Sequence, residues 1–213
     1  MFKENLENPI EILNRNDELK NEGAAVLEAM KIEKTENGYL SEIDEGRIEE
    51  ASEIMAEIFD NDVISNWSEL SNEEKAEKFT EYQTRLGEAW GIEAKGVIFE
   101  NMERDDGIVT YGYNSGDGYI HINEKFLDDP TQLKEMLDTT THEMRHQFQV
   151  EVLRRPQDFK DIPKLTKLQW YYNFTHYKST DEYSFRAYAR QGIEVDARKT
   201  AEDVLNRYIN KIQ

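Results

Sequence analysis

Two amphipathic helices are predicted between about residues 45 and 92, because apolar residues recur there at i, i+3 and i+4. The first helix carries the stripe Ile48, Ala51, Ile54, Met55 and Ile58. The second is expected over about 72–90, with the stripe Ala76, Phe79, Tyr82, Leu86 and Trp90. Ser71, followed three residues later by Glu74, forms a capping box at its start. Short helices are also expected near 9–13 and 24–30, so residues 1–94 are predicted to be a helical region that packs on the rest.

After Gly91 the pattern changes to short apolar runs that are typical of strands. Strands are predicted at 96–100, 108–114 and 118–123, with turn residues between them. We therefore expect a small antiparallel sheet. The strand at 119–123 would also be able to pair with an extended substrate by strand addition.

A long helix is predicted to follow the sheet. Asp129 is a good N-cap and Pro130 a good first residue, and Pro156 ends the helix after two arginines. Its apolar stripe contains Leu133, Leu137, Met144, Phe148 and Val152. His142 and His146 lie on an adjacent stripe, so they can face a cleft while the opposite side of the helix is buried.

Residues 156–182 have no clear period and are expected to form a loop or a broken helix. A further helix is predicted over about 181–208, interrupted at Gly192. Together these elements predict an α+β fold, with a domain over residues 95–213 that contains the sheet, the long helix and the C-terminal helix.

Composition restricts the function. The 213 residues include 26 Lys and Arg against 45 Asp and Glu, a formal net charge of −19, which argues against nucleic acid or an anionic membrane as a partner. No apolar run is long enough to span a bilayer, and the first residues contain no secretory signal, so a cytoplasmic protein or export by a signal-independent route is expected. With no Cys in the chain, a metal must be held by His, Asp or Glu.

The long helix contains the motif His142-Glu143-Met144-Arg145-His146, which reads H-E-x-x-H. Residues four apart share a face of a helix, so both imidazoles can bind one metal ion. Glu143 can then reach a water at the metal and act as a general base. The alternative hypothesis is a helix with two unrelated histidines and a solvated Glu.

A catalytic zinc commonly has three protein ligands. The third is expected to be a carboxylate from the later helix, and Glu194 is the best candidate because the small residue Ala197 on the same face allows close approach of two helices. Asp196 is the next candidate, followed by Asp181 and Glu182.

These residues resemble the zincin metallopeptidases with a Glu ligand, the gluzincins, and more narrowly the compact zincin domains of bacterial toxins and phage-associated proteins. The resemblance covers roughly residues 95–210 and rests on the H-E-x-x-H helix, the strand 120–123 and Glu194-x-x-Ala197. It implies a zinc cofactor, a zincin-like α+β fold and hydrolysis of peptide bonds with Glu143 as the base. In the thermolysin-like branch an Asp stands four residues after the ligand Glu, whereas this chain has Arg198.

Two functional hypotheses follow. The first is a zinc endopeptidase with a peptide or protein substrate, possessing an oxyanion donor for which Tyr188 and His176 are the candidates. A toxin or phage-associated effector would fit this description. The second is a non-enzymatic interaction protein on a zincin scaffold, with a structural or vestigial metal site. Glu143 favours the first, because a site kept only to hold metal needs no base there.

Overall fold

The computed structural model describes residues 44–213 except 104–108, 117 and 181. The helices predicted near 9–13 and 24–30 therefore lie outside the described residues. The described elements are, in order, α3 (Glu45–Ile58), α4 (Asn61–Ser65), η1 (Trp67–Glu69), α5 (Asn72–Trp90), β1 (Gly96–Glu100), β2 (Gly112–Asn114), β3 (Tyr119–Asn123), η2 (Glu124–Phe126), η3 (Pro130–Gln132), α6 (Leu133–Arg154), α7 (Lys164–Thr175), α8 (Phe185–Ala189) and α9 (Gly192–Ile212).

Helices α3 and α5 confirm the two helices predicted from apolar spacing. At the start of α5 the Ser71 backbone N–H donates to Glu74 Oε2 at 2.8 Å and the Glu74 N–H donates to Ser71 Oγ at 3.2 Å, which is the predicted capping box. The helix ends at Gly91, whose φ of 70° lies in the left-handed region that a residue with a Cβ rarely adopts.

The sheet is mixed, so the prediction of an all-antiparallel sheet is wrong. Its order is β1-β3-β2, with β1 parallel to β3 and β2 antiparallel to β3. Strand β3 is central and has neighbours on both sides, which contradicts the prediction that the strand at 119–123 accepts an extended substrate. The antiparallel pairing of β2 with β3 agrees with the predicted turn after residue 114.

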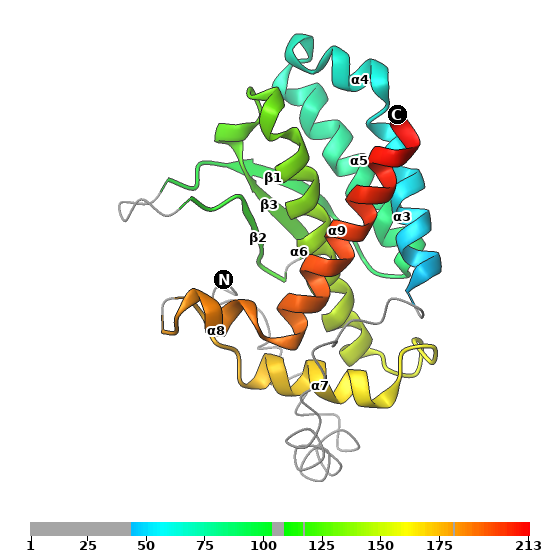
Figure 1. Ribbon diagram of the computed structural model, residues 1–213, viewed down its shortest axis with the longest axis vertical. Coiled ribbons are helices and arrows are strands. Elements are labelled where there is room, and N and C mark those ends of the chain that lie inside the picture. Colours follow the sequence, from blue (N-terminus) through cyan, green and yellow to red (C-terminus); the bar gives the residue numbers. More distant parts are fainter. Residues whose placement is uncertain (1–43, 104–108, 117, 181) are drawn as a thin grey trace.

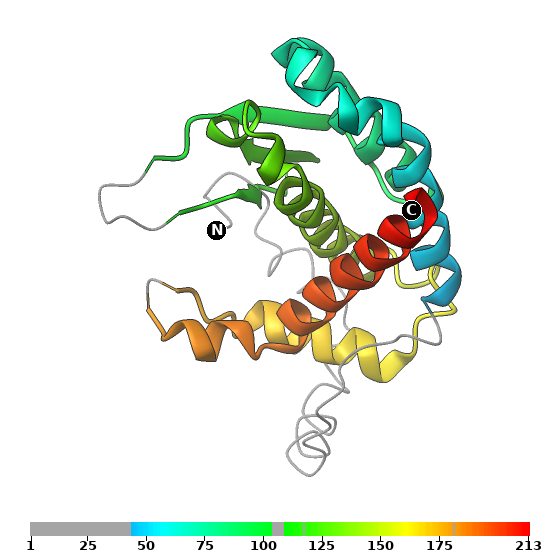
Figure 2. The same cartoon turned by 45° about the horizontal axis from the view of Figure 1, so that its top comes forward.

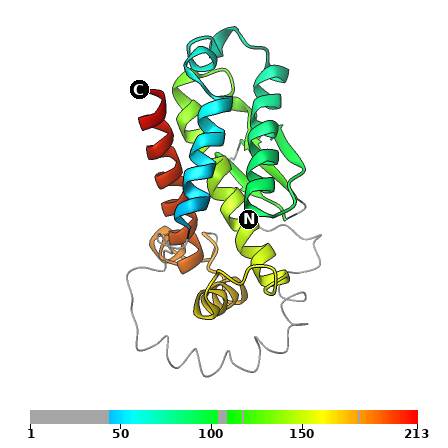
Figure 3. The same cartoon turned by 90° about the vertical axis from the view of Figure 1, so that its right-hand side faces the viewer.

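Helix α6 confirms the predicted long helix. Asp129 Oδ1 accepts a hydrogen bond from the Thr131 N–H, and Pro130 begins a single 3₁₀ turn, η3, that leads into α6. The five residues of its predicted apolar stripe are all buried: Leu133, Leu137, Met144, Phe148 and Val152. Figure 1 shows α9 crossing α6 near its middle, and Figure 3 shows α3, α5 and α9 extending along the same long direction.

The region 156–182, expected to be a loop or a broken helix, contains the regular helix α7 over Lys164–Thr175. Its buried face mixes apolar side chains such as Trp170 with the polar residues Thr166 and Lys167. The Lys167 ammonium donates to the carbonyl oxygens of Pro156 and Phe159 at 2.8 and 2.7 Å, which closes the preceding loop onto the helix. Because polar residues with buried partners stand on the buried face of α7, its apolar residues do not show a clear helical spacing in the sequence.

The C-terminal helix is two helices, α8 and α9, and Gly192 is the first residue of α9 rather than an interruption within it. Side chains from α3, α5, the sheet, α6, α7 and α9 form one buried hydrophobic cluster. In the part of the chain that the structure describes, no helix is long and apolar enough to span a bilayer.

Candidate metal centre

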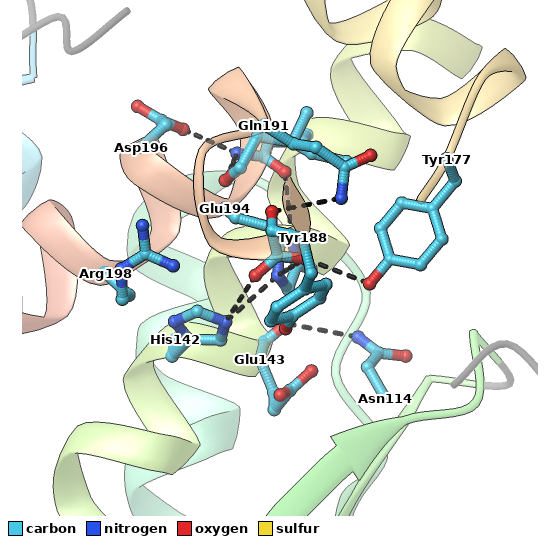
Figure 4. Close-up of polar contacts among 12 residues, drawn as sticks. Asn114, His142, Glu143, Tyr177, Tyr188, Gln191, Glu194, Asp196 and Arg198 are labelled. Carbon is cyan, nitrogen blue, oxygen red and sulfur yellow. Dashed lines mark hydrogen bonds and ion pairs between the residues drawn. The ribbon is translucent and has the colours of Figure 1, made fainter. Parts of the chain in front are cut away.

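The structure brings His142, His146 and Glu194 together where α6 and α9 cross (Figure 4). The two Nε2 atoms of the histidines lie 3.1 Å apart. Glu194 Oε2 is 3.5 Å from His142 Nε2, and Glu194 Oε1 is 3.5 Å from His146 Nε2. Glu194 is 1% exposed and His146 is 6% exposed, whereas the His142 side chain retains 13%, so the cluster opens toward solvent beside His142.

These separations fit a single metal ion. Tetrahedral zinc with bonds of about 2.0–2.1 Å holds neighbouring ligand atoms about 3.3 Å apart, and the observed distances are 3.1, 3.5 and 3.5 Å. Glu194 Oε2 is buried and has no hydrogen-bond partner in the described part of the chain, apart from its 3.5 Å contact with His142. A buried carboxylate oxygen without a partner is costly, and a cation between the three side chains would remove that cost.

Local structure explains how Glu194 reaches the histidines. Glu194 lies in the first turn of α9, where the helix dipole stabilises a negative charge. Ala197 and Ala201 are both fully buried one and two turns later, so the backbone of α9 can lie close to α6. The start of α9 is fixed by Gln191, whose amide accepts from the Lys178 N–H at 2.7 Å and donates to the Lys178 carbonyl at 3.1 Å.

The pKa values of Glu194 and His146 are shifted in opposite directions within the cluster. Burial alone would raise the pKa of Glu194, but the positive charge of His146 and the 3.5 Å contacts with both histidines hold that pKa well below its usual range. Burial alone would lower the pKa of His146, but the Glu194 carboxylate raises it to about 9. Without metal, the neutral-pH state therefore contains an ionised Glu194 and a protonated His146.

This protonation predicts a pH dependence of metal affinity. A metal must displace the proton from His146 Nε2, because a ligand nitrogen needs its lone pair. The apparent affinity for zinc should therefore rise about tenfold per pH unit toward the His146 pKa of about 9, and level off above it. Competition with a chromophoric chelator over a series of pH values measures this slope. A flat profile between pH 6.5 and 9 would contradict it.

The free energy of unfolding of the metal-free protein should fall as the pH rises, whereas zinc affinity should rise. The folded pKa of His146, about 9, lies above the ordinary value of 6.5. Its protonation therefore stabilises the fold fully below pH 6.5, and this contribution is lost as the pH rises through about 9. Urea unfolding of the chelator-treated protein across this window measures the loss.

Two tyrosines lie beside Glu194. The Tyr177 hydroxyl donates to Glu194 Oε1 at 3.0 Å, and the Tyr177 and Tyr188 rings lie edge to face at 6.2 Å. Burial, followed by the negative charge of Glu194, raises the pKa of both tyrosines. Both hydroxyls therefore stay protonated at neutral pH and can act as hydrogen-bond donors.

Glu143 lies on the sheet side of the cluster. Its backbone carbonyl accepts a hydrogen bond from the Asn114 amide of β2 at 3.1 Å, and Figure 4 shows its side chain between His142 and Asn114. Its charge acts on the pKa values of His146, Tyr177 and Tyr188, so its carboxylate belongs to the same electrostatic environment.

Asp196 and Glu182, the other carboxylate candidates that the structure describes, are not part of the cluster. Asp196 is fully buried against Arg145, from which it accepts hydrogen bonds at 2.8 and 3.0 Å. Glu182 is exposed, and Asp181 lies outside the described residues. Arg198, which occupies the position four after Glu194, donates to the Ala189 carbonyl at the end of α8.

The other two histidines are also elsewhere. His176 is exposed, stacks on Tyr172 and lies 3.1 Å from the Tyr172 carbonyl oxygen through Nδ1. It therefore contacts the last turn of its own helix rather than Glu194. His121 stacks on Tyr113 within the sheet and pairs with Glu100 at 3.2 Å.

Sequence reasoning missed Tyr177 and Gln149. Tyr177 lies in a segment for which no helix was predicted, and nothing in the sequence relates it to Glu194. Gln149 Oε1 lies 3.0 Å from His146 Nδ1. Gln149 follows His146 by three positions on one helix, so the i, i+3 rule would have found it.

A scan of protein-family models, a search of curated proteins and a search of solved structures each found no match for this chain. The chain is therefore characterised by what the structure itself contains, a His142–His146–Glu194 cluster able to hold a metal ion in an α+β fold.

Proposed function

We propose that this protein is a zinc-dependent metallopeptidase. One observation carries the proposal: two imidazole nitrogens and a buried carboxylate converge at 3.1–3.5 Å, and Glu143 stands next to the first of them in the chain. This combination supplies two metal-ligand candidates and a candidate base on the same turn of α6, and a third ligand candidate from α9. A metal site with a purely structural role would have no use for Glu143.

Zinc is the metal that the donor set favours. Two imidazoles and one carboxylate are typical of catalytic zinc sites, which leave a position free for water or substrate. Magnesium and calcium prefer sites made of oxygen atoms, and these two nitrogen donors disfavour them. When bound, zinc lowers the pKa of a water ligand toward neutrality and polarises a carbonyl oxygen.

Glu143 is proposed as the general base. Its carboxylate accepts a proton from the attacking water and returns it to the nitrogen of the leaving amine. His142, His146 and Glu194 would hold the metal, and the Tyr177 hydroxyl would orient Glu194 through its hydrogen bond to Oε1.

Tyr188 is proposed as the donor to the oxyanion that develops on the substrate carbonyl. Its hydroxyl stays protonated because burial and the Glu194 charge raise its pKa. A hydrogen bond that strengthens as charge develops on the oxygen lowers the barrier rather than only binding the substrate. The Tyr188 hydroxyl interacts with both Glu194 and Tyr177, so it lies beside the metal-binding candidates.

An endopeptidase is proposed rather than an exopeptidase. Among the described strands, β2 pairs only with β3. We propose that an extended peptide adds to the opposite edge of β2. Asn114 at the end of β2 contacts the Glu143 backbone at 3.1 Å, so a peptide added at this edge would extend past the base. Figure 2 shows β2 and α8 on either side of the point where α6 and α9 meet.

The direct test is metal analysis followed by a cleavage assay. The purified protein should contain about one zinc per chain and should cleave a mixture of unstructured peptides at internal bonds. A chelator should stop cleavage and added zinc should restore it. Absence of zinc after dialysis against a zinc buffer would refute the metal site. Stoichiometric zinc without cleavage would instead favour an interaction protein on a zincin scaffold.

A further inference from the structure

The side of His146 that faces away from Glu194 contacts a chain of buried polar side chains. Its Nδ1 atom lies 3.0 Å from Gln149 Oε1. The Gln149 amide nitrogen in turn lies 3.1 Å from the Ile193 carbonyl oxygen and 2.6 Å from Asp196 Oδ2. Gln149 and Asp196 are both fully buried, so water does not compete for these contacts.

The chemistry of these partners determines which atom donates. A backbone carbonyl and a carboxylate only accept hydrogen bonds, so the group of Gln149 that faces Ile193 and Asp196 must be its NH₂. Its carbonyl oxygen must then face His146, and it too only accepts. The Nδ1 atom of His146 must therefore carry a proton, which leaves Nε2 to present its lone pair toward His142 and Glu194 when the ring is neutral.

Asp196 is held in turn by Arg145. The guanidinium Nε donates to Asp196 Oδ2 at 2.8 Å and Nη2 donates to Oδ1 at 3.0 Å, a bidentate arrangement with a defined orientation. Arg145 Nη2 also contacts Asp44 at 2.5 Å. Arg145 lies on α6 and Asp196 on α9, so this pair joins the same two helices that carry the metal-binding candidates.

We propose that Gln149 is a positioning residue that fixes the tautomer and ring orientation of His146, and that Asp196, held by Arg145, keeps the Gln149 amide in the required orientation. The inference rests on the proposed function in so far as His146 is a metal ligand. A partner of this kind on a ligating histidine typically changes metal affinity about 10- to 100-fold. Asp196 lies two residues after Glu194 in the chain. In this proposal it acts on the site through Gln149 and is not itself a metal ligand.

The test replaces Gln149 with Met, which has a similar length and no hydrogen-bonding amide. Gln149→Met should bind zinc about 10- to 100-fold more weakly in competition with a chromophoric chelator. Gln147→Met is the matched control. Gln147 is also a buried amide on α6, but it donates to the Glu93 carbonyl and contacts Asn114 instead of His146. The control should lose comparable stability and keep wild-type zinc affinity.

A spectroscopic measurement separates positioning from general destabilisation, and its first part needs only the wild type. In the ¹⁵N-labelled, zinc-loaded wild type, His146 should bind zinc through Nε2, and its Nδ1 proton should exchange slowly with solvent. In Gln149→Met the same proton should exchange faster. Zinc bound through Nδ1, or wild-type zinc affinity together with unchanged exchange in the variant, would overturn the inference.

Failure of the proposed function is distinguishable from failure of this inference. If the wild type takes up no zinc, the metallopeptidase proposal fails, and the tautomer can still be determined from the ¹⁵N spectrum of the metal-free protein once the His146 ring is deprotonated at high pH. An Nδ1-protonated ring there supports the role of Gln149, and an Nε2-protonated ring refutes it. If zinc binds normally and only Gln149→Met has no effect, the inference alone fails.

Discussion

Glu143→Gln should lower peptidase activity about 10²- to 10⁴-fold, which is the range that a positioned general base contributes. The amide has nearly the same size as the carboxylate but cannot accept a proton from water. Zinc content and thermal stability should not change, because Glu143 is not among the three side chains of the metal cluster. Turnover of a cleaved peptide, elemental analysis and a melting curve measure the three quantities.

Glu135→Gln provides the control for this substitution. Glu135 is an exposed residue in the first turn of α6, so the same chemical change occurs on the same helix outside the cluster. Its turnover should equal that of the wild type. Normal turnover in Glu143→Gln would show that another group takes the proton and would remove Glu143 from the mechanism.

Glu194→Ala should cause the largest loss of metal affinity that a change on α9 can produce. It removes one of three ligands, so the loss should exceed the about 10- to 100-fold effect of changing a residue behind a ligand. The variant should be isolated with little zinc, and the raised pKa of His146 should fall because its main anionic neighbour is gone. Elemental analysis and NMR titration of the histidines measure these two effects.

Glu202→Ala is the matched control on α9. Glu202 is exposed and its ion pair is with Lys199 at 3.7 Å, so its loss removes a carboxylate from the same helix without disturbing the cluster. It should keep wild-type zinc content. A Glu194→Ala variant that still contains stoichiometric zinc would show that other groups hold the metal.

Local patterns determined helices α3, α5 and α6 of this protein. The capping box at Ser71 and Gly91 at the other end define α5, because both act on backbone groups within a few residues. The four-residue spacing of His142 and His146 placed two imidazoles on one face of α6 for the same reason. Glu194 could be selected from the sequence because its helical face carries a small residue, Ala197, three positions later.

Only the tertiary structure decided how these elements pair. The parallel alignment of β1 with β3 depends on the path of the chain between them, and the apolar pattern of each strand is the same for either direction. Helix α7 was not predicted because its buried face contains Lys167, whose ammonium is satisfied by hydrogen bonds to carbonyl oxygens of the preceding loop.

The same holds for the surroundings of the cluster. Arg145 is a fully buried cation whose partners Asp44 and Asp196 are 101 and 51 positions away, so its burial follows from their charges and not from its neighbours in sequence. Tyr177 contacts Glu194 because the next residue, Lys178, is hydrogen-bonded to Gln191 at the start of α9. The metal-binding candidates are thus set by local spacing, whereas the groups that orient them depend on long-range contacts.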